Sequence, residues 1–179
     1  FFNKHLSMDK PQMGEYNPYF QKYINLVGNG NFLVLLKQNT DESLHFFKTI
    51  PAEKHNYRYA EKKWTIKELL MHIIDTERVF AYRALVSSRE DSTTILCSMN
   101  EDWYASHTDV SNRSMDSLIE ELSIVRKSTE FLFKYITEEQ SKFMASIGKD
   151  KITARAIGYI TIGHILHHIN IIKERYLGK

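Results

Sequence analysis

The sequence predicts an all-α protein built as a four-helix bundle, and three observations lead to that fold class. Four stretches of about 20 residues repeat apolar side chains at steps of three and four, which is the period of an amphipathic helix. The 179 residues include only seven glycines and three prolines, and no polar–apolar alternation is long enough to build a sheet. A chain of this length corresponds to one domain. Four helices with one apolar stripe each bury those stripes most simply against one another.

The N-terminal part of the chain carries prolines, glycines and aromatic residues but no helical period. We therefore expect residues 1–29 to form an irregular extension, which packs on the bundle of residues 30–179 through its aromatic side chains. The first helix is predicted over 31–50, because apolar residues recur there at helical spacing and Pro51 cannot continue a helix.

The second helix is predicted over 65–86 and begins at a capping box. In this motif the side chains of Thr65 and Glu68 each accept a hydrogen bond from a backbone N–H that the first turn leaves free. The connection that follows, 87–113, is too long to be structureless in a compact domain, so it is expected to contain a helical turn or two. Two aromatic residues of this loop are expected to pack over an end of the bundle and to line a substrate pocket: Trp103 and Tyr104.

The third helix is predicted over 114–136, with one continuous apolar stripe. A second capping-box pattern at 137–140 predicts a shorter helix directly after it. The last helix is predicted over 152–177, and Gly178 is placed to end it.

Composition and charge exclude several classes of protein. The 24 basic and 22 acidic side chains nearly balance, at a net charge of +2, so no large positive field indicates a nucleic-acid partner. No stretch approaches the roughly 18 consecutive apolar residues of a membrane-spanning helix. The single cysteine, Cys97, excludes an intramolecular disulfide framework and a multi-cysteine zinc site, and a cytoplasmic location is the default expectation.

Three of the eight histidines fall within five residues of the last predicted helix. His164 and His168 are four residues apart, so they project from one helical face, which is otherwise mostly apolar and is expected to turn inward. A metal ion would satisfy two buried imidazoles; alternatively, one histidine forms an internal hydrogen bond while the other touches solvent. His167 is off this face and is expected at its edge. Ile165 stands where an HExxH protease motif has its glutamate, so a thermolysin-type protease is not expected.

A catalytic metal site usually has three protein ligands and one open position, and His72 is the candidate third ligand. Its helical face is unusually polar for an otherwise apolar helix, which suggests a lined cavity. Glu68 on this face is explained by the capping box. Asp75 and Arg83 are not, although a salt bridge or a place at the solvated rim would account for either.

With these residues in place, the chain resembles the DinB/YfiT-like family of metal-dependent enzymes. The resemblance rests on two separated motifs in the expected order, KWTIKELLMHIIDTER at 63–78 and GHILHHI at 163–169. It implies a four-helix bundle of the DinB/YfiT type, often a homodimer, with a divalent metal, nickel or zinc, held by three histidines. Carried over position by position, the ligands would be His72, His164 and His168.

Two positions depart from the family pattern. Ile165 replaces a glutamate that often follows the first histidine of the second motif, and residues 96–101 read LCSMNE where close relatives tend to have PGFDE. These departures leave the three histidines untouched. The second departure falls in the loop that would contact a substrate, so any such contact is expected to differ from that of the relatives.

Two functions are compatible with this set of residues. In the first, the chain is a metal-dependent transferase or hydrolase that acts on a small molecule, with a low-molecular-weight thiol as the cofactor implied by thiol-dependent members of the family. Asp75 would then orient a histidine, Arg83 would hold an anionic group, and His167 would assist from beside the ligands. In the second, the metal only stabilises a helical bundle that serves as a binding or stress-response module. An open coordination position next to a pocket would favour the enzyme.

Overall fold

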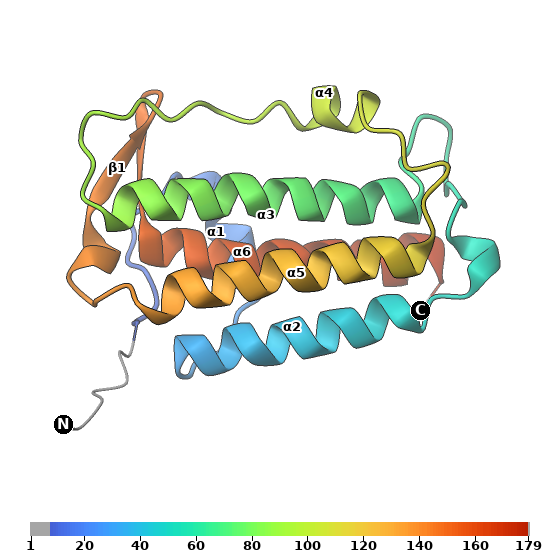
Figure 1. Cartoon of the computed structure of the whole chain (residues 1–179), viewed down its shortest axis with the longest axis horizontal. Coiled ribbons are helices and arrows are strands. Elements are labelled where there is room, and N and C mark those ends of the chain that lie inside the picture. The colour runs from blue at the N-terminus through green and yellow to red at the C-terminus, as the bar shows by residue number, and fades with distance from the viewer. Residues whose placement is uncertain (1–7, 179) are drawn as a thin grey trace.

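Four long helices lie side by side in the computed structural model, which describes residues 8–178 (Figure 1). They are α2 (Phe32–Lys48), α3 (Ile66–Ser88), α5 (Met115–Lys134) and α6 (Ala154–Ile171), and a π-helical turn, η4 (Ile172–Tyr176), extends the last one. Their ends lie within two residues of those predicted from the sequence. The predicted four-helix bundle is therefore confirmed. None of the described helices combines the length and the apolar character needed to cross a membrane.

The start of α3 follows directly from its capping box. The backbone N–H of Glu68 donates to the Thr65 hydroxyl oxygen at 3.1 Å, and the backbone N–H of Thr65 donates to the Glu68 carboxylate at 2.7 Å. Both donors would otherwise be unsatisfied at the helix end. This cap fixes where α3 begins, and with it the position of every side chain further along the helix.

A small β-hairpin between α5 and α6 corrects two expectations. Strands β1 (Met144–Ile147) and β2 (Asp150–Thr153) pair antiparallel around Gly148, whose φ of +57° suits a tight turn. The helix predicted after 137–140 is reduced to a 3-10 turn, η3 (Gln140–Lys142), and α6 begins only after β2. The capping hydrogen bonds at 137–140 do form, but the helical conformation ends after a single turn and the chain then extends into β1.

The long connection between α3 and α5 contains a helical turn and a half, as predicted, in α4 (Glu101–Ser106). Figure 1 shows this connection running along α3, with α4 above the middle of the bundle, and α4 contacts α3. The expectation that the loop covers an end of the bundle is therefore wrong. Instead, α4 lies over the helix that carries His72.

The segment before α2 also has regular structure, in the turn η1 (Pro18–Phe20) and the short helix α1 (Gln21–Ile24), which packs on α6. The two backbones meet at Gly163. A Cβ atom added there would lie 2.1 Å from the carbonyl oxygen of Tyr23, so any side chain at this position would force the segments apart. A residue without a side chain thus brings the N-terminal segment against the helix that carries His164.

A polar network is buried among α2, α3 and α5, between the apolar clusters that fill the rest of the bundle. The guanidinium of Arg126, 1% exposed, donates to the Glu77 carboxylate at 2.6 Å and to the Asn39 side-chain oxygen at 2.7 Å. Thr129 donates to the other carboxylate oxygen of Glu77 at 2.8 Å. The buried charges of Arg126 and Glu77 thus compensate each other, and the hydrogen bonds of this network link α2, α3 and α5; a longer one, 3.5 Å from Arg126 to the carbonyl oxygen of Thr161, reaches α6.

Candidate metal centre

The three histidines singled out in the sequence come together at the contact between α3 and α6. The Nε2 atom of His164 lies 3.3 Å from that of His72 and 3.0 Å from that of His168. One ring nitrogen from each histidine falls within 4.8 Å of the others, and all three side chains are buried. The spacing of four between His164 and His168 sets these two rings on one face of α6, and the packing of α3 brings His72 to them.

The donor set fits a divalent metal. Burial lowers the pKa of His72 to about 4 and holds the pKa values of His164 and His168 well below the usual value of 6.5. The rings are therefore neutral near pH 7, which is the form in which imidazole binds a metal. A tetrahedral ion at 2.0–2.1 Å from each ligand would separate their nitrogens by roughly 3.3 Å, close to both Nε2–Nε2 distances.

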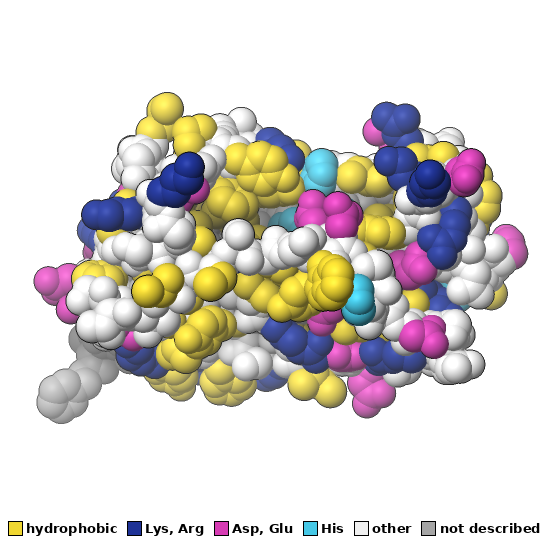
Figure 2. Space-filling view, turned by 90° about the horizontal axis from the view of Figure 1, so that it is seen from above, with side chains coloured by type: hydrophobic (Ala, Val, Ile, Leu, Met, Phe, Trp, Pro, Cys, Tyr) yellow, Lys and Arg dark blue, Asp and Glu magenta, His cyan; other side chains and the backbone are white. Residues whose placement is uncertain are grey.

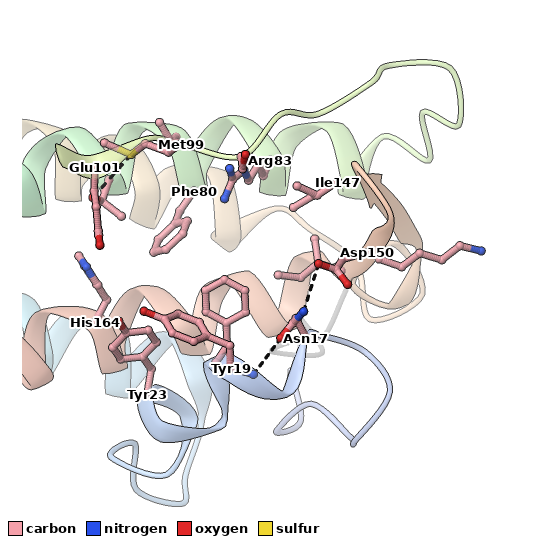
Figure 3. Close-up of a pocket in the computed structure, with 16 residues that line it drawn as sticks. Asn17, Tyr19, Tyr23, Phe80, Arg83, Met99, Glu101, Ile147, Asp150 and His164 are labelled. Atoms are coloured by element: carbon pink, nitrogen blue, oxygen red, sulfur yellow. Dashed lines mark hydrogen bonds between the residues drawn. The ribbon is translucent and has the colours of Figure 1, made fainter. Parts of the chain in front are cut away.

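A cavity of about 270 Å³ opens next to His164. Aromatic and apolar side chains form most of its wall, and Arg83 lies further along it (Figure 3). In the space-filling view of the face that carries the loop, histidines are visible at and within a hollow bordered by hydrophobic side chains (Figure 2). The histidine cluster therefore borders a space large enough for a small molecule.

Residues 35–172 match the sequence model of the DinB superfamily. The chain belongs to the DinB superfamily. No match to a curated protein sequence reaches significance. The family assignment agrees with the resemblance carried by the two histidine motifs, both of which lie within the matched residues.

Solved structures share this DinB fold at low sequence identity. YfiT from Bacillus subtilis, described as a probable metal-dependent hydrolase with an unusual four-helix bundle topology, is 18% identical with a TM-score of 0.69, over 94% of this chain and 93% of its own. A DinB-like protein from B. subtilis, YjoA, is 16% identical with a TM-score of 0.58, over 83% and 92%. A mycothiol-dependent maleylpyruvate isomerase is 12% identical with a TM-score of 0.60. This match covers 78% of the present chain and 58% of the isomerase.

In this DinB chain the side chain that lies beside His72 is not the one expected from the sequence. Asp75 pairs with Arg78, at 3.4 Å, rather than with a histidine, and burial raises the pKa of its carboxyl group. The group beside the ring of His72 is the hydroxyl of Thr76, 3.5 Å from Nδ1. The expected orienting contact from Asp75 is thus replaced by Thr76, because the residue four positions further along a helix faces the ring.

The other predicted residues divide between the cavity and its surroundings. Arg83 lines the cavity, whereas the ring of His167 packs on Tyr23 at a centroid distance of 5.3 Å and lies outside the histidine cluster. Trp103 is exposed and stacks on His107, at a centroid distance of 3.9 Å. Tyr104 borders a separate, much smaller cavity on the other side of His72.

Two groups near the histidines were not found from the sequence. Glu101 reaches in from α4, and its carboxylate Oε2 lies 4.0 Å from Nε2 of His72. The Trp64 ring packs on His72 at a centroid distance of 4.8 Å. The sequence holds no signal that places α4 over α3, so the position of Glu101 could be learned only from the fold. Trp64 lies just before the N-cap of α3, outside the helix, so its contact with His72 likewise follows from the fold.

The burial of the histidines predicts how the metal-free chain responds to acid. The pKa of His72 is 6.5 in an unfolded chain and about 4 in the folded one, so the unfolded state binds more protons between these values. The free energy of unfolding should therefore decrease as the pH falls below 6.5, and it should go on decreasing toward pH 4. Urea unfolding of chelator-treated protein between pH 7.5 and 5 measures this slope, above the range in which carboxylates titrate.

The matched control for this slope is another histidine of the same chain. His72→Gln should reduce the slope, whereas His45→Gln, at an exposed position near the end of α2, should leave it unchanged. A free energy of unfolding that stays constant from pH 7.5 to 5 would contradict the buried, neutral state of the histidines.

Proposed function

We propose that the chain is a metal-dependent enzyme, a transferase or hydrolase, that acts on a small molecule in the cavity next to His164. The observation that carries the proposal is the convergence of three neutral, buried imidazoles at one end of that cavity. Three protein ligands with a free position toward a pocket is the arrangement of catalytic metal sites, whereas structural sites are closed by a fourth protein ligand.

In this proposal His72, His164 and His168 hold a divalent metal, nickel or zinc. When bound, such an ion supplies Lewis acidity that lowers the pKa of a coordinated water or thiol toward neutrality. The Thr76 hydroxyl lies 3.5 Å from Nδ1 of His72, and a hydrogen bond from Nδ1–H to this hydroxyl would leave Nε2, which is directed at His164, free of a proton. Phe80 and Tyr23 pack edge-on against the His164 ring and hold its orientation, at centroid distances of 5.7 and 5.6 Å.

A thiol-dependent transfer is the finer form of the proposal. It is supported by the isomerase neighbour, whose name states a dependence on mycothiol, and by the open cavity beside His164. Asp75, His167, Trp103 and Tyr104 keep their predicted supporting roles only as proposals. The homodimer and the cytoplasmic location expected from the sequence likewise stay predictions.

The alternative is a metal-stabilised bundle without catalytic activity, which serves as a binding or stress-response module. The burial of all three histidines favours a stabilising metal in either case. The accessible cavity beside His164 is what favours the enzyme, because a purely stabilising ion needs no space next to it.

The test is turnover by metal-loaded protein. Untagged protein should contain close to one divalent ion per chain, and the loaded form should transfer or hydrolyse members of a panel of thiols and electrophiles. Turnover per bound metal should rise with pH through the neutral range, as the coordinated water or thiol loses its proton. Metal content measured across the same pH series separates this rise from loss of metal at low pH. Fully loaded protein with no exchangeable position and no turnover would favour the non-catalytic module.

A further inference from the structure

Arg83 is a buried cation that forms no ion pair within residues 8–178. Its side chain lies in the cavity wall at 7% exposure, and one guanidinium nitrogen, Nη2, donates to the carbonyl oxygen of Cys97 at 2.6 Å. Among residues 8–178, no carboxylate forms an ion pair with it. The other two arginines that are equally buried, Arg126 and Arg155, each hold a carboxylate. Arg83 is thus the exception among the buried arginines of the described chain.

A buried guanidinium is costly when its charge is not compensated. Burial lowers the pKa of Arg83, but an arginine stays protonated at any pH at which the protein is folded. The hydrogen bond to the carbonyl oxygen of Cys97 uses one of the guanidinium N–H groups, and this acceptor carries no formal charge. Figure 3 shows the guanidinium turned toward the interior of the cavity, where a bound anion would compensate its charge.

The distance between Arg83 and the histidines sets the length of a molecule that carries the anionic group and reaches both. Thr76, at the histidine end of the cavity, lies seven residues earlier on α3, which corresponds to about 10 Å along the helix. Phe80, one turn before Arg83, already packs on the His164 ring. A molecule that touches both Arg83 and the histidine end therefore spans roughly 5–10 Å, and a volume of about 270 Å³ admits a small metabolite.

The charged and aromatic side chains of the cavity wall narrow the class of molecule that the cavity fits. Lys151 also lines it, but so do Glu101 and Asp150, so these three side chains together with Arg83 leave no excess of positive charge for a dianion. A carboxylate, with one charge and a planar pair of oxygens, matches the guanidinium. Between Arg83 and His164 the wall is aromatic, from Phe20, Tyr23 and Phe80, which suits an apolar or unsaturated carbon skeleton.

We propose that Arg83 binds the carboxylate of a small monoanionic substrate, whose apolar middle part lies along the aromatic wall and whose reactive group reaches the histidines. This assignment of a substrate class rests on the proposed function, in that the histidine end is where the reaction takes place. The anion site itself is a property of the cavity and is measured by binding, whether or not turnover is found.

The test uses 3-phenylpropanoate as the probe, with 3-phenylpropanamide as its uncharged analogue and phenyl phosphate as the dianion. Binding to the full-length chain, at its measured metal content, is followed by NMR titration. The carboxylate should bind more tightly than the amide, and Arg83→Met should weaken carboxylate binding about 10–100-fold while leaving amide binding unchanged. Arg83→Lys, which keeps the charge but loses the planar pair of donors, should bind the carboxylate more weakly than the unchanged chain and more tightly than Arg83→Met.

The matched control is Arg89→Met, an exposed arginine at the end of the same helix, which should bind all three probes as the unchanged chain does. Metal content should be the same in every variant. Equal binding of carboxylate and amide to the unchanged chain would overturn the proposal without any variant, and so would carboxylate binding that Arg83→Met does not weaken. Arg83-dependent binding of phenyl phosphate tighter than that of the carboxylate would overturn the substrate class. Arg83-dependent carboxylate binding without turnover would leave the anion site standing and reject the proposed function alone.

Discussion

Replacing His164 with alanine should remove the metal from the chain. His164 is the central member of the cluster, because its Nε2 atom lies 3.3 Å from that of His72 and 3.0 Å from that of His168. A zinc ion bound by protein side chains is held by about 10–16 kcal/mol in total, so the loss of one of three ligands should weaken binding at least 100-fold. Elemental analysis of untagged protein after dialysis measures the effect.

The neighbouring histidine provides the control for this experiment. His167 is one position from His168 on α6, but its ring packs on Tyr23 and it lies outside the cluster. His167→Ala should therefore keep the metal, whereas His72→Ala and His168→Ala should lose it as His164→Ala does. Retention of metal by His168→Ala together with its loss from His167→Ala would show that the ligands are assigned wrongly.

Replacing Arg126 with methionine should destabilise the fold by about 3–5 kcal/mol. The guanidinium and the Glu77 carboxylate are 1% and 2% exposed, so removing the cation leaves a buried negative charge without its ion pair. Urea unfolding of the metal-free chain measures the change in free energy. The double variant Arg126→Met with Glu77→Gln should be more stable than the sum of the two single effects predicts, because it leaves no unpaired charge.

A surface ion pair serves as the comparison. Arg78, 46% exposed, pairs with Glu121 at 2.6 Å, and Arg78→Met should cost no more than about 1 kcal/mol. A loss for Arg126→Met as small as that of Arg78→Met would mean that water reaches Glu77 in the folded chain. The network would then be a solvated ion pair instead of a buried cross-link.

The four helices and the pair His164 and His168 could be predicted because both depend on short, regular spacings, whereas His72 followed from the polar face of its helix and from the family motif. A period of three and four places a stripe, a capping box marks the start of α3, and a spacing of four places His164 beside His168. The hairpin could not be predicted, because strands of four residues give too few alternations to stand out from a loop. The position of α4 depends on tertiary packing, so Glu101 could not be placed.

The buried network shows a different limit of sequence reasoning. Asn39 and Thr129 fall on the apolar stripes of their helices, where small polar residues are easily accepted as part of the core. Their role depends on Glu77 and Arg126, which come from helices whose relative rotation the sequence does not state. In the same way, the polar stripe around His72 predicted a lined cavity, but which of its side chains lies beside the ring depends on the orientation of that ring.

Because α1 packs directly on α6 at Gly163, two separate stretches of the chain form the wall of the cavity. The histidines and Arg83 belong to the helices matched by the family model, whereas Asn17, Tyr19, Phe20 and Tyr23 precede the matched residues 35–172. Substitutions of Asn17, Tyr19 or Phe20 in this N-terminal wall would reshape the cavity without replacing a histidine, whereas Tyr23 also packs on the His164 ring. A bulkier residue at position 163 would act in the same direction, by lifting α1 outward and widening the cavity. Part of the cavity wall can therefore vary with a segment that lies outside the matched residues, while the helices that carry the histidines and Arg83 stay unchanged.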